Sequence, residues 1–330
     1  MGRHGLKYFL ICFLALLFLG IVRFSYTCYS LMFTPMVSGP HNEILIKIDK
    51  ASSASLFVHH LKSKKLISSE SFFLFLIRIQ GYSNRLKAGI YRIEDGESAA
   101  HFLSRVVAGD VLKLFFRVTE GTTKRQVVAD LKQAPYLVYQ ESDWQRVAEG
   151  NPEGLILADT YQYDAMSSGA DLLGHAHETL EKYLDTIWQQ RANDLPYKTP
   201  YELLIVASIL EKETATPEER RLISGVVVNR LRKHMPLQMD PTVIYAQGEA
   251  YRGKLTHEDL KIDSPYNTYR YRGLPPTPIA MVGRDAIDAA AHPKQSNFLY
   301  FVARGDGTHC FSASYEEQKK AIAHYLRTKS

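Results

Sequence analysis

An unbroken apolar run from Tyr8 to Val22 constrains this chain more than any other feature of its sequence. Basic side chains flank the run at both ends: Arg3, His4, Lys7 and Arg23. At ~1.5 Å per residue the run is shorter than the ~30 Å hydrocarbon core of a membrane, so the next residues must complete the span while Arg23 snorkels to the headgroups. The run therefore predicts a transmembrane helix over residues 8–28.

A cleaved signal peptide is the main alternative to an anchor. Ser25-Tyr26-Thr27 is a poor substitute for a small-residue cleavage site, and the residues before Cys28 do not form a convincing lipobox. We therefore favour an uncleaved anchor, followed by a linker over residues 29–42. Because positive charge precedes the run, we expect residues 1–7 in the cytoplasm and the rest of the chain outside it.

The composition is that of a folded protein. Its 330 residues are enough for two domains, and 45% of them are hydrophobic, which permits a substantial core. A formal net charge of +5 without a Lys/Arg block argues against nucleic acid as a partner and suits an anionic envelope or membrane surface. Of the three cysteines, Cys12 and Cys28 fall in the anchor, which leaves Cys310 alone and excludes a disulfide framework.

Strands and helices alternate over residues 43–135 and predict a small α+β module. Its expected strands are Ile44 to Ile48, Gly89 to Ile93 and Leu112 to Val118, and its expected helices are Leu56 to Leu66, Ser71 to Gln80, one ending at Ala108 and one ending at Lys132. The fold class of the whole chain is therefore α+β.

Residues 136–330 are expected to form a second, mainly helical domain after a loop-like connector at 141–170. Two of its helices open with a Thr-Pro pair and a Glu three residues after the Thr, which predicts a capping box at Thr199 and another at Thr216. The other expected elements are helices at Leu173 to Trp188, Asp285 to Ala291 and Ser314 to Leu326 and a strand at Phe298 to Ala303. The segment after Pro236 is rich in proline and is expected to be loops.

Glu211 is the strongest candidate for a catalytic acid. It ends the helix that begins at Pro200, which is apolar almost all round and is therefore expected to be buried. Desolvation and the negative end of the helix dipole both favour a protonated carboxyl there, as a general acid requires. Glu213 points about 200° away and cannot share the site. The plainer interpretation, that both glutamates are the solvated end of a helix, stays open.

Two polar segments further along the chain could bind a sugar. The first carries Gln238, Asp240, Thr242 and Tyr245, and the second carries Asn267 and Tyr269 in a proline-rich loop. Their amide, carboxylate, hydroxyl and phenol groups suit hydrogen bonds to sugar hydroxyls and acetamido groups. The alternative is structural: a turn that caps the next segment and a stiff loop with packed tyrosines.

Other chemistries find little support. His257, His292 and His309 lack the spacing of a metal site, and there is no His-Glu-x-x-His sequence. His309 and Cys310 are adjacent, and on a strand they would face opposite ways. The sequence has no Gly-rich phosphate loop and no Gly-x-Ser-x-Gly. We therefore expect no metal and no cofactor.

Several motifs, in this order, closely resemble the YceG-like endolytic murein transglycosylase family. They cover most of the chain from about residue 43 to 326: Leu86 to Gly89, Ala207 to Thr214, Val228 to Leu231, Leu237 to Tyr245, Tyr266 to Tyr269, Gly273 to Ile279, Ala289 to Pro293 and Leu299 to Val302. The resemblance implies a single-pass inner-membrane protein with a LysM-like module and a periplasmic YceG-like catalytic domain. It further implies cleavage of peptidoglycan between N-acetylmuramic acid and N-acetylglucosamine.

In that family the position of Glu211 is held by the catalytic glutamate. The resemblance implies a non-hydrolytic reaction that leaves a 1,6-anhydro end, and it makes Gln238, Asp240, Thr242 and Asn267 candidates for holding the sugar or orienting Glu211. The chain departs from the family pattern at Leu155 to Ala158, where an aromatic residue and a proline are lost, while Asp159, Thr160 and Tyr161 remain. Asp159 is thus a substrate-binding candidate in a subsite that has changed.

Two other functions stay open. A hydrolytic muramidase would need a second carboxylate to activate water, with Asp240 or Asp159 as the nearest candidates. A catalytically inactive protein would bind glycan strands and act as a scaffold for wall synthesis. The expected partners are glycan strands and the inner membrane, and the resemblance adds penicillin-binding peptidoglycan synthases.

Overall fold

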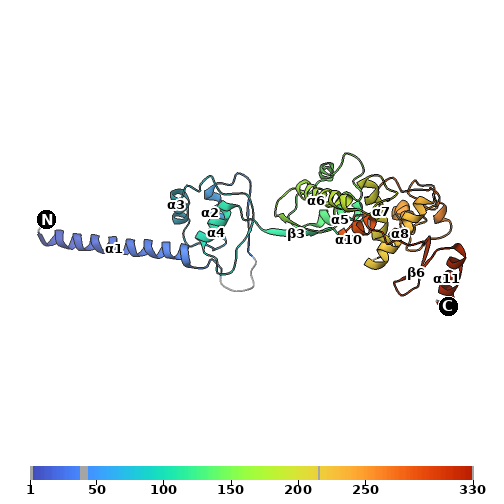
Figure 1. Ribbon diagram of the computed structural model, residues 1–330. Coiled ribbons are helices and arrows are strands. Elements are labelled where there is room, and N and C mark those ends of the chain that lie inside the picture. The colour runs from blue at the N-terminus through green and yellow to red at the C-terminus, as the bar shows by residue number, and fades with distance from the viewer. Residues whose placement is uncertain (1–2, 38–43, 215, 329–330) are drawn as a thin grey trace. The chain divides into compact units, whose positions relative to one another are not determined.

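The computed structural model describes residues 3–37, 44–214 and 216–328 (Figure 1). They form a mixed α+β fold, as expected from the sequence. The chain divides into two compact units. The first unit comprises residues 1–114 and 164–166, and the second comprises residues 115–163 and 167–330.

The first helix, α1 (Arg3–Phe33), is longer than the predicted anchor. By length and composition, its part from Lys7 to Phe33 is long and apolar enough to cross a membrane. Residues 29–33, which we expected in a linker, continue the helix because Leu31 is 3% exposed and packs in the core of the first unit. Met36 then donates its N–H to the Glu97 carbonyl at 2.8 Å, while residues 38–43 lie outside the described residues.

Two antiparallel strands and three helices build the rest of the first unit. Strand β1 (Leu45–Ile48) pairs with β2 (Gly89–Arg92), and the helices are α2 (Ala54–Ser63), α3 (Glu70–Ile79) and α4 (Ala99–Ala108). Each helix begins at a serine whose hydroxyl accepts an N–H from the first turn: Ser53, Ser69 and Ser98. The elements enclose a core that includes Ile46, Phe57, Phe73, Tyr91 and Phe102.

The boundary between the units lies earlier than the sequence suggested. We divided the chain between residues 135 and 136, but the structure divides it between residues 114 and 115. The reason is that β3 (Lys113–Arg117) pairs with β4 (Thr160–Asp164), and α5 (Lys124–Gln133) belongs to the second unit. The segment 141–170, which we expected to be a loop-like connector, contains β4 and a 3₁₀ helix at Glu141–Arg146, so the expectation of loops alone was wrong.

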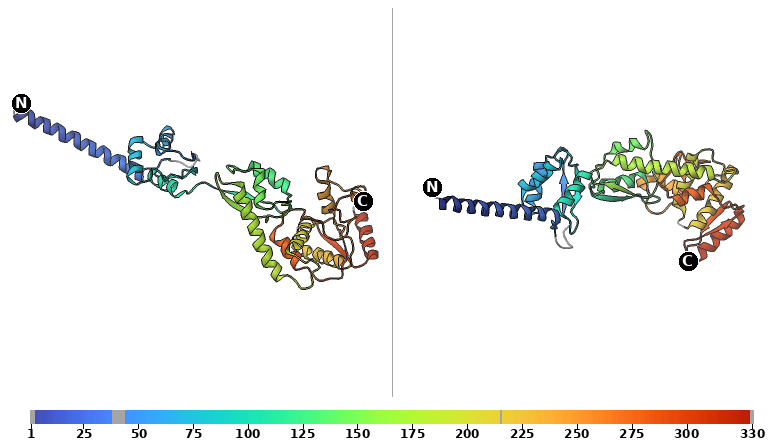
Figure 2. Two further views of the ribbon diagram at one scale, coloured as in Figure 1. Left: turned by 90° about the horizontal axis from the view of Figure 1, so that it is seen from above. Right: turned by 60° about the vertical axis from the view of Figure 1, so that its left-hand side comes forward.

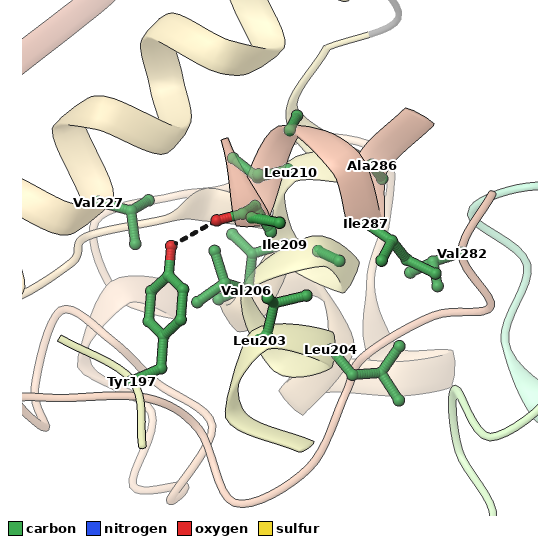
Figure 3. Close-up of a cluster of buried hydrophobic side chains, with 14 of the residues drawn as sticks. Tyr197, Leu203, Leu204, Val206, Ile209, Leu210, Val227, Val282, Ala286 and Ile287 are labelled. Atoms are coloured by element: carbon green, nitrogen blue, oxygen red, sulfur yellow. Dashed lines mark hydrogen bonds between the residues drawn. The ribbon is translucent and has the colours of Figure 1, made fainter. Parts of the chain in front are cut away.

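A helical core carries the second unit. Its helices are α6 (Gly169–Gln190), α7 (Pro200–Glu213), α8 (Pro217–Arg232), α9 (Asp240–Gln247) and α10 (Arg284–Ala291). Helix α7 is buried on all sides from Leu203 to Leu210, as its sequence predicted. Figure 3 shows its side chains between those of Val227 in α8 and Ile287 in α10. In the same core the Tyr197 hydroxyl donates to the Ala290 carbonyl at 2.8 Å.

Several local predictions need correction. Helix α9 lies where we expected loops, because Asp240 and Pro241 open a helix there. Thr199 caps α7 by accepting the N–H of Glu202 at 3.1 Å, but the described residues include no such side-chain bond at Thr216. Short 3₁₀ helices occupy Gly248–Ala250 and Asp259–Lys261.

A hairpin and a helix end the chain. Strand β5 (Tyr300–Ala303) pairs antiparallel with β6 (His309–Ser312), and α11 (Tyr315–Thr328) contacts both strands (Figure 2). The sequence predicted β5 and α11 but not β6. The hairpin is attached to α8 through His309, whose N–H and ring nitrogen contact the Glu219 carboxylate at 2.9 and 2.7 Å.

Candidate active site

The carboxyl group of Glu211 lies at the end of the buried helix α7. Its side chain is only 6% exposed. One oxygen, Oε2, accepts the Gly283 N–H at 2.8 Å, and the other, Oε1, accepts from the Arg220 guanidinium at 3.3 Å. Both partners come from other segments, so tertiary packing fixes the orientation of this carboxyl group.

Burial raises the pKa of the Glu211 carboxyl above its usual value. The Gly283 N–H and the charge of Arg220 act in the opposite direction, and the negative charges of Glu120 and Asp285 add to the increase. Desolvation prevails, so Glu211 keeps its proton to a higher pH than a carboxyl in water.

Glu211 lines a cavity of about 560 Å³ within the second unit. Most of the lining is polar: Arg117, Val118, Glu120, Ala158, Asp159, Thr160, Glu211, Arg220, Gly283, Arg284 and Asp285. Such a mixture of guanidinium, carboxylate and hydroxyl groups can hydrogen-bond several hydroxyls of a sugar at once. The cavity therefore offers a proton donor beside groups that suit a polyhydroxylated ligand.

The two partners of Glu211 come from the loop before α10 and from helix α8. Gly283 directly precedes α10, and the loop before it is fixed because Gly121 and Met281 are joined by an N–H···O bond of 2.8 Å. Arg220 lies in the first turns of α8, where its Nε and Nη2 donate to the Thr214 carbonyl at 3.2 and 3.0 Å. These bonds hold the guanidinium against the end of α7.

Asp159 lies in the same cavity as Glu211. Although burial alone would raise its pKa, the Thr160 N–H and the Arg284 guanidinium, which donates to Oδ2 at 2.7 Å, together lower the pKa of the Asp159 carboxyl. Asp159 is therefore ionised at a pH where Glu211 is still protonated. The cavity thus holds two carboxyl groups whose pKa values are moved in opposite directions.

Asp240 and Tyr269 lie near Glu213 instead, and Gln238 contacts Arg230, whose charge also acts on Glu213. The Tyr269 hydroxyl donates to Asp240 Oδ1 at 2.5 Å, and the Arg230 guanidinium lies 3.4 Å from Gln238 Oε1. Burial, reinforced by the charge of Asp240 and opposed by that of Arg230, raises the pKa of the Glu213 carboxyl to about 8. Glu211 and Glu213 therefore lie among different neighbours, as expected from their positions on one helix.

Thr242 and Asn267 are fully buried and bond within the protein. The Thr242 hydroxyl donates to the Met239 carbonyl at 2.7 Å, and the Asn267 amide donates to the Leu260 and Ile262 carbonyls at 3.0 and 2.8 Å. In this conformation both side chains support the polar loops, and their role in binding a substrate stays a prediction.

Tyr245 lines a second cavity of about 460 Å³. Its hydroxyl donates to the buried Glu153 carboxylate at 3.2 Å. Lys212 forms part of the same lining and donates to the carbonyl of Gly121, which directly follows Glu120 of the first cavity, at 2.9 Å.

Most of the partners of Glu211 could not be recognised from the sequence. Gly283 and Arg220 lie far along the chain from it or on another helix, and no spacing rule connects them. The only signal was indirect: Gly283-Arg284-Asp285 precedes a predicted helix, and the N–H groups at a helix start attract carboxylates.

Together, the fold and the site define a helical α+β protein with a buried carboxyl group of raised pKa in a polar cavity. The model of the YceG-like family matches residues 46–324, and the chain belongs to this family. It is 29% identical to the endolytic murein transglycosylase of Bacillus subtilis over 90% of this chain and 88% of that protein. The enzyme of the same name from Streptococcus pneumoniae is 26% identical over 98% of this chain and 66% of its own length.

A solved structure supports the same assignment. A yceG-like protein from Listeria monocytogenes is 29% identical, with a TM-score of 0.52 over 85% of this chain and 99% of that one. The resemblance inferred from the sequence motifs is therefore confirmed.

Proposed function

We propose that this protein is a membrane-anchored endolytic lytic transglycosylase of peptidoglycan, with Glu211 as its acid and base. The observation that carries the proposal is the Glu211 carboxyl group, which is desolvated, oriented by Gly283 and exposed only to a polar cavity. Two similar proteins are named endolytic murein transglycosylases, which supports peptidoglycan as the substrate class.

The reaction needs one carboxyl group that gives and then takes a proton. Protonated Glu211 donates its proton to the glycosidic oxygen, the bond from that oxygen to C1 of N-acetylmuramic acid breaks, and N-acetylglucosamine leaves with a hydroxyl. The C6 hydroxyl of the same muramic acid then attacks C1 and returns its proton to Glu211. Atoms and charge balance without water, and the product carries a 1,6-anhydro ring.

Gly283 and Arg220 have a defined part in this cycle. Once Glu211 has given its proton, the Gly283 N–H and the Arg220 guanidinium stabilise the carboxylate that remains. Asp159 and Arg284 are proposed to bind sugar hydroxyls in the same cavity. For Gln238, Asp240 and Tyr269, which lie near Glu213 or contact Arg230, we propose contacts with a more distant part of the strand.

We propose that the first unit holds the enzyme at the membrane and binds the glycan strand. Its helix α1 supports a single-pass anchor in the inner membrane. The basic residues that precede the apolar run support a cytoplasmic N-terminus and a periplasmic second unit. The family resemblance implies a LysM-like module, which we predicted over residues 43–135 and of which the first unit contains the part up to residue 114; such a module would bind glycan strands, so that the enzyme would cut nascent strands near the membrane. Association with penicillin-binding synthases stays a prediction.

Digestion of purified peptidoglycan tests the proposal. The full-length protein in detergent micelles, its Glu211→Gln variant and a Glu181→Gln control, whose side chain is 63% exposed on α6, are compared by mass spectrometry of the released fragments. We expect fragments that end in 1,6-anhydromuramic acid from the wild type and the control and none from Glu211→Gln.

Two other outcomes would contradict the proposal. Reducing ends, heavier than anhydro ends by one water, would indicate a hydrolase in which ionised Asp159 activates water. Binding of glycan strands without cleavage by the wild type, even after reconstitution into vesicles, would favour the scaffold.

A further inference from the structure

Helix α3 of the first unit is apolar around most of its circumference, apart from the side that carries Ser71 and Arg78, yet only part of its apolar surface is buried. Phe73 and Ile77 pack in the core of the unit. Phe72, Phe75 and Ile79 share another face, on which Phe75 is 49% and Ile79 is 69% exposed. A wide apolar surface on a helix is normally buried in a protein core or in a membrane. We therefore expect another apolar surface to cover the apolar face of α3, which consists of Phe72, Phe75 and Ile79.

The position of this face relative to α1 indicates what covers it. The ring of Phe72 packs edge-on against that of Phe24 in α1, with centroids 5.1 Å apart, and α3 lies beside the C-terminal half of α1 (Figure 1). Phe24 directly follows Arg23 and belongs to the segment that is apolar enough to cross a membrane. The apolar face of α3 is thus continuous with the surface of the proposed anchor.

The depth of the contact follows from the sequence of α1. If Arg23 snorkels to the headgroups while residues 24–28 complete the span, Phe24 lies in the outer part of the acyl-chain region, and Phe72 lies there with it. Beyond Phe24, the exposed aromatic side chains of Tyr26, Tyr29 and Phe33 are typical of a membrane interface. The buried Leu31 fixes α1 to the unit, so α3 cannot lie far from this level.

We infer that the apolar face of α3 inserts into the outer leaflet of the membrane beside α1, as a second lipid contact. Helices that lie in the interface bury their apolar face roughly 5–10 Å deep. Arg78, exposed on α3 between Ile77 and Ile79, can bind a lipid phosphate. The inference depends on the anchoring role proposed for α1, and it adds a second attachment that holds the first unit against the bilayer surface.

Fluorescence quenching in vesicles tests this inference. The full chain with its three cysteines replaced by serine receives one new cysteine, at Phe75→Cys, Ile79→Cys, Leu17→Cys or Glu181→Cys, labelled with a polarity-sensitive dye. Each is reconstituted into phosphatidylcholine–phosphatidylglycerol vesicles whose acyl chains are brominated near the headgroup or near the chain end. Leu17 in α1 reports on the anchor, and Glu181 on α6 serves as the exposed control.

We expect the emission of the labels at 75 and 79 to shift to shorter wavelength and to be quenched more by bromine near the headgroup than by bromine near the chain end. The label at 17 should be quenched by bromine near the chain end, and the label at 181 by neither. Unquenched labels at 75 and 79 with a quenched label at 17 would overturn this inference and leave the anchor intact. A blue shift at 75 and 79 without quenching would mean that protein covers the face and would also overturn it. An unquenched label at 17 would instead refute the anchor itself.

Discussion

Replacement of Glu213 by Gln should stabilise the second unit at neutral and alkaline pH. The pKa of this carboxyl is raised from 4.5 to about 8 in the folded chain. Between these values the folded chain keeps a proton that the unfolded chain has released, so the free energy of unfolding decreases as the pH rises through this window. A Gln side chain carries no such proton and removes this part of the pH dependence.

The size of the effect follows from the two pKa values. The interval from 4.5 to about 8 corresponds to about 5 kcal/mol at ~1.36 kcal/mol per pH unit. The Glu213 side chain keeps some contact with solvent, which screens its charge, so we expect about 2–3 kcal/mol of stabilisation at pH 8 and little at pH 4.5.

Urea unfolding of the full-length protein in detergent, followed by tryptophan fluorescence between pH 4.5 and 9, measures this effect. The chain has two tryptophans, Trp144 and Trp188, and both lie in the second unit with Glu213. The Glu181→Gln control should keep the pH dependence of the wild type. An equally steep loss of stability with pH in Glu213→Gln would refute the reasoning.

Two further predictions concern residues of α8. Arg220→Gln removes the cation beside Glu211 and should raise the pKa of this carboxyl further, so that the high-pH limb of the rate of anhydro-end formation moves to higher pH. An unchanged limb would show that the guanidinium does not act on Glu211. Gly225→Ala places a Cβ 2.4 Å from the Lys294 carbonyl oxygen and should cost about 1–3 kcal/mol in the free energy of unfolding. The control Gly150→Ala, with no heavy atom within 4 Å of the new Cβ, should cost much less. Equal losses of stability in urea titrations would contradict this prediction.

The helices were predictable because their signals are local. Apolar periodicity placed α2, α3, α6 and α10, and together with the Thr199 cap it placed α7, within a few residues of their observed bounds. Strand β4 was missed although Tyr161 and Tyr163 alternate with exposed residues, because Gly and Pro nearby suggested loops. Helix α9 was missed because eight residues that open with Asp-Pro resemble a turn.

The acid could be proposed from the sequence, but its surroundings could not. Glu211 lies on the same helix as the apolar residues that bury it, so its desolvation is visible in a short segment. Its hydrogen bond with Gly283 joins residues 72 positions apart and exists only because α10 packs against α7. For the same reason the sequence grouped Asp240 and Asn267 with Glu211, whereas packing gives each of them other partners.

Helix α1 runs without a break into the core of the first unit, which has a mechanical consequence in a membrane. A helix that is apolar on all sides has no preferred rotation about its axis in lipid, but its length fixes its depth. Because Leu31 is buried in the core of the first unit, the depth and tilt of α1 in the bilayer also set the height and tilt of that unit. One residue inserted between Val22 and Arg23 would leave the contacts of the unit unchanged and lift it by ~1.5 Å. A series of such insertions would therefore serve as a ruler of how far from the bilayer the first unit can still work.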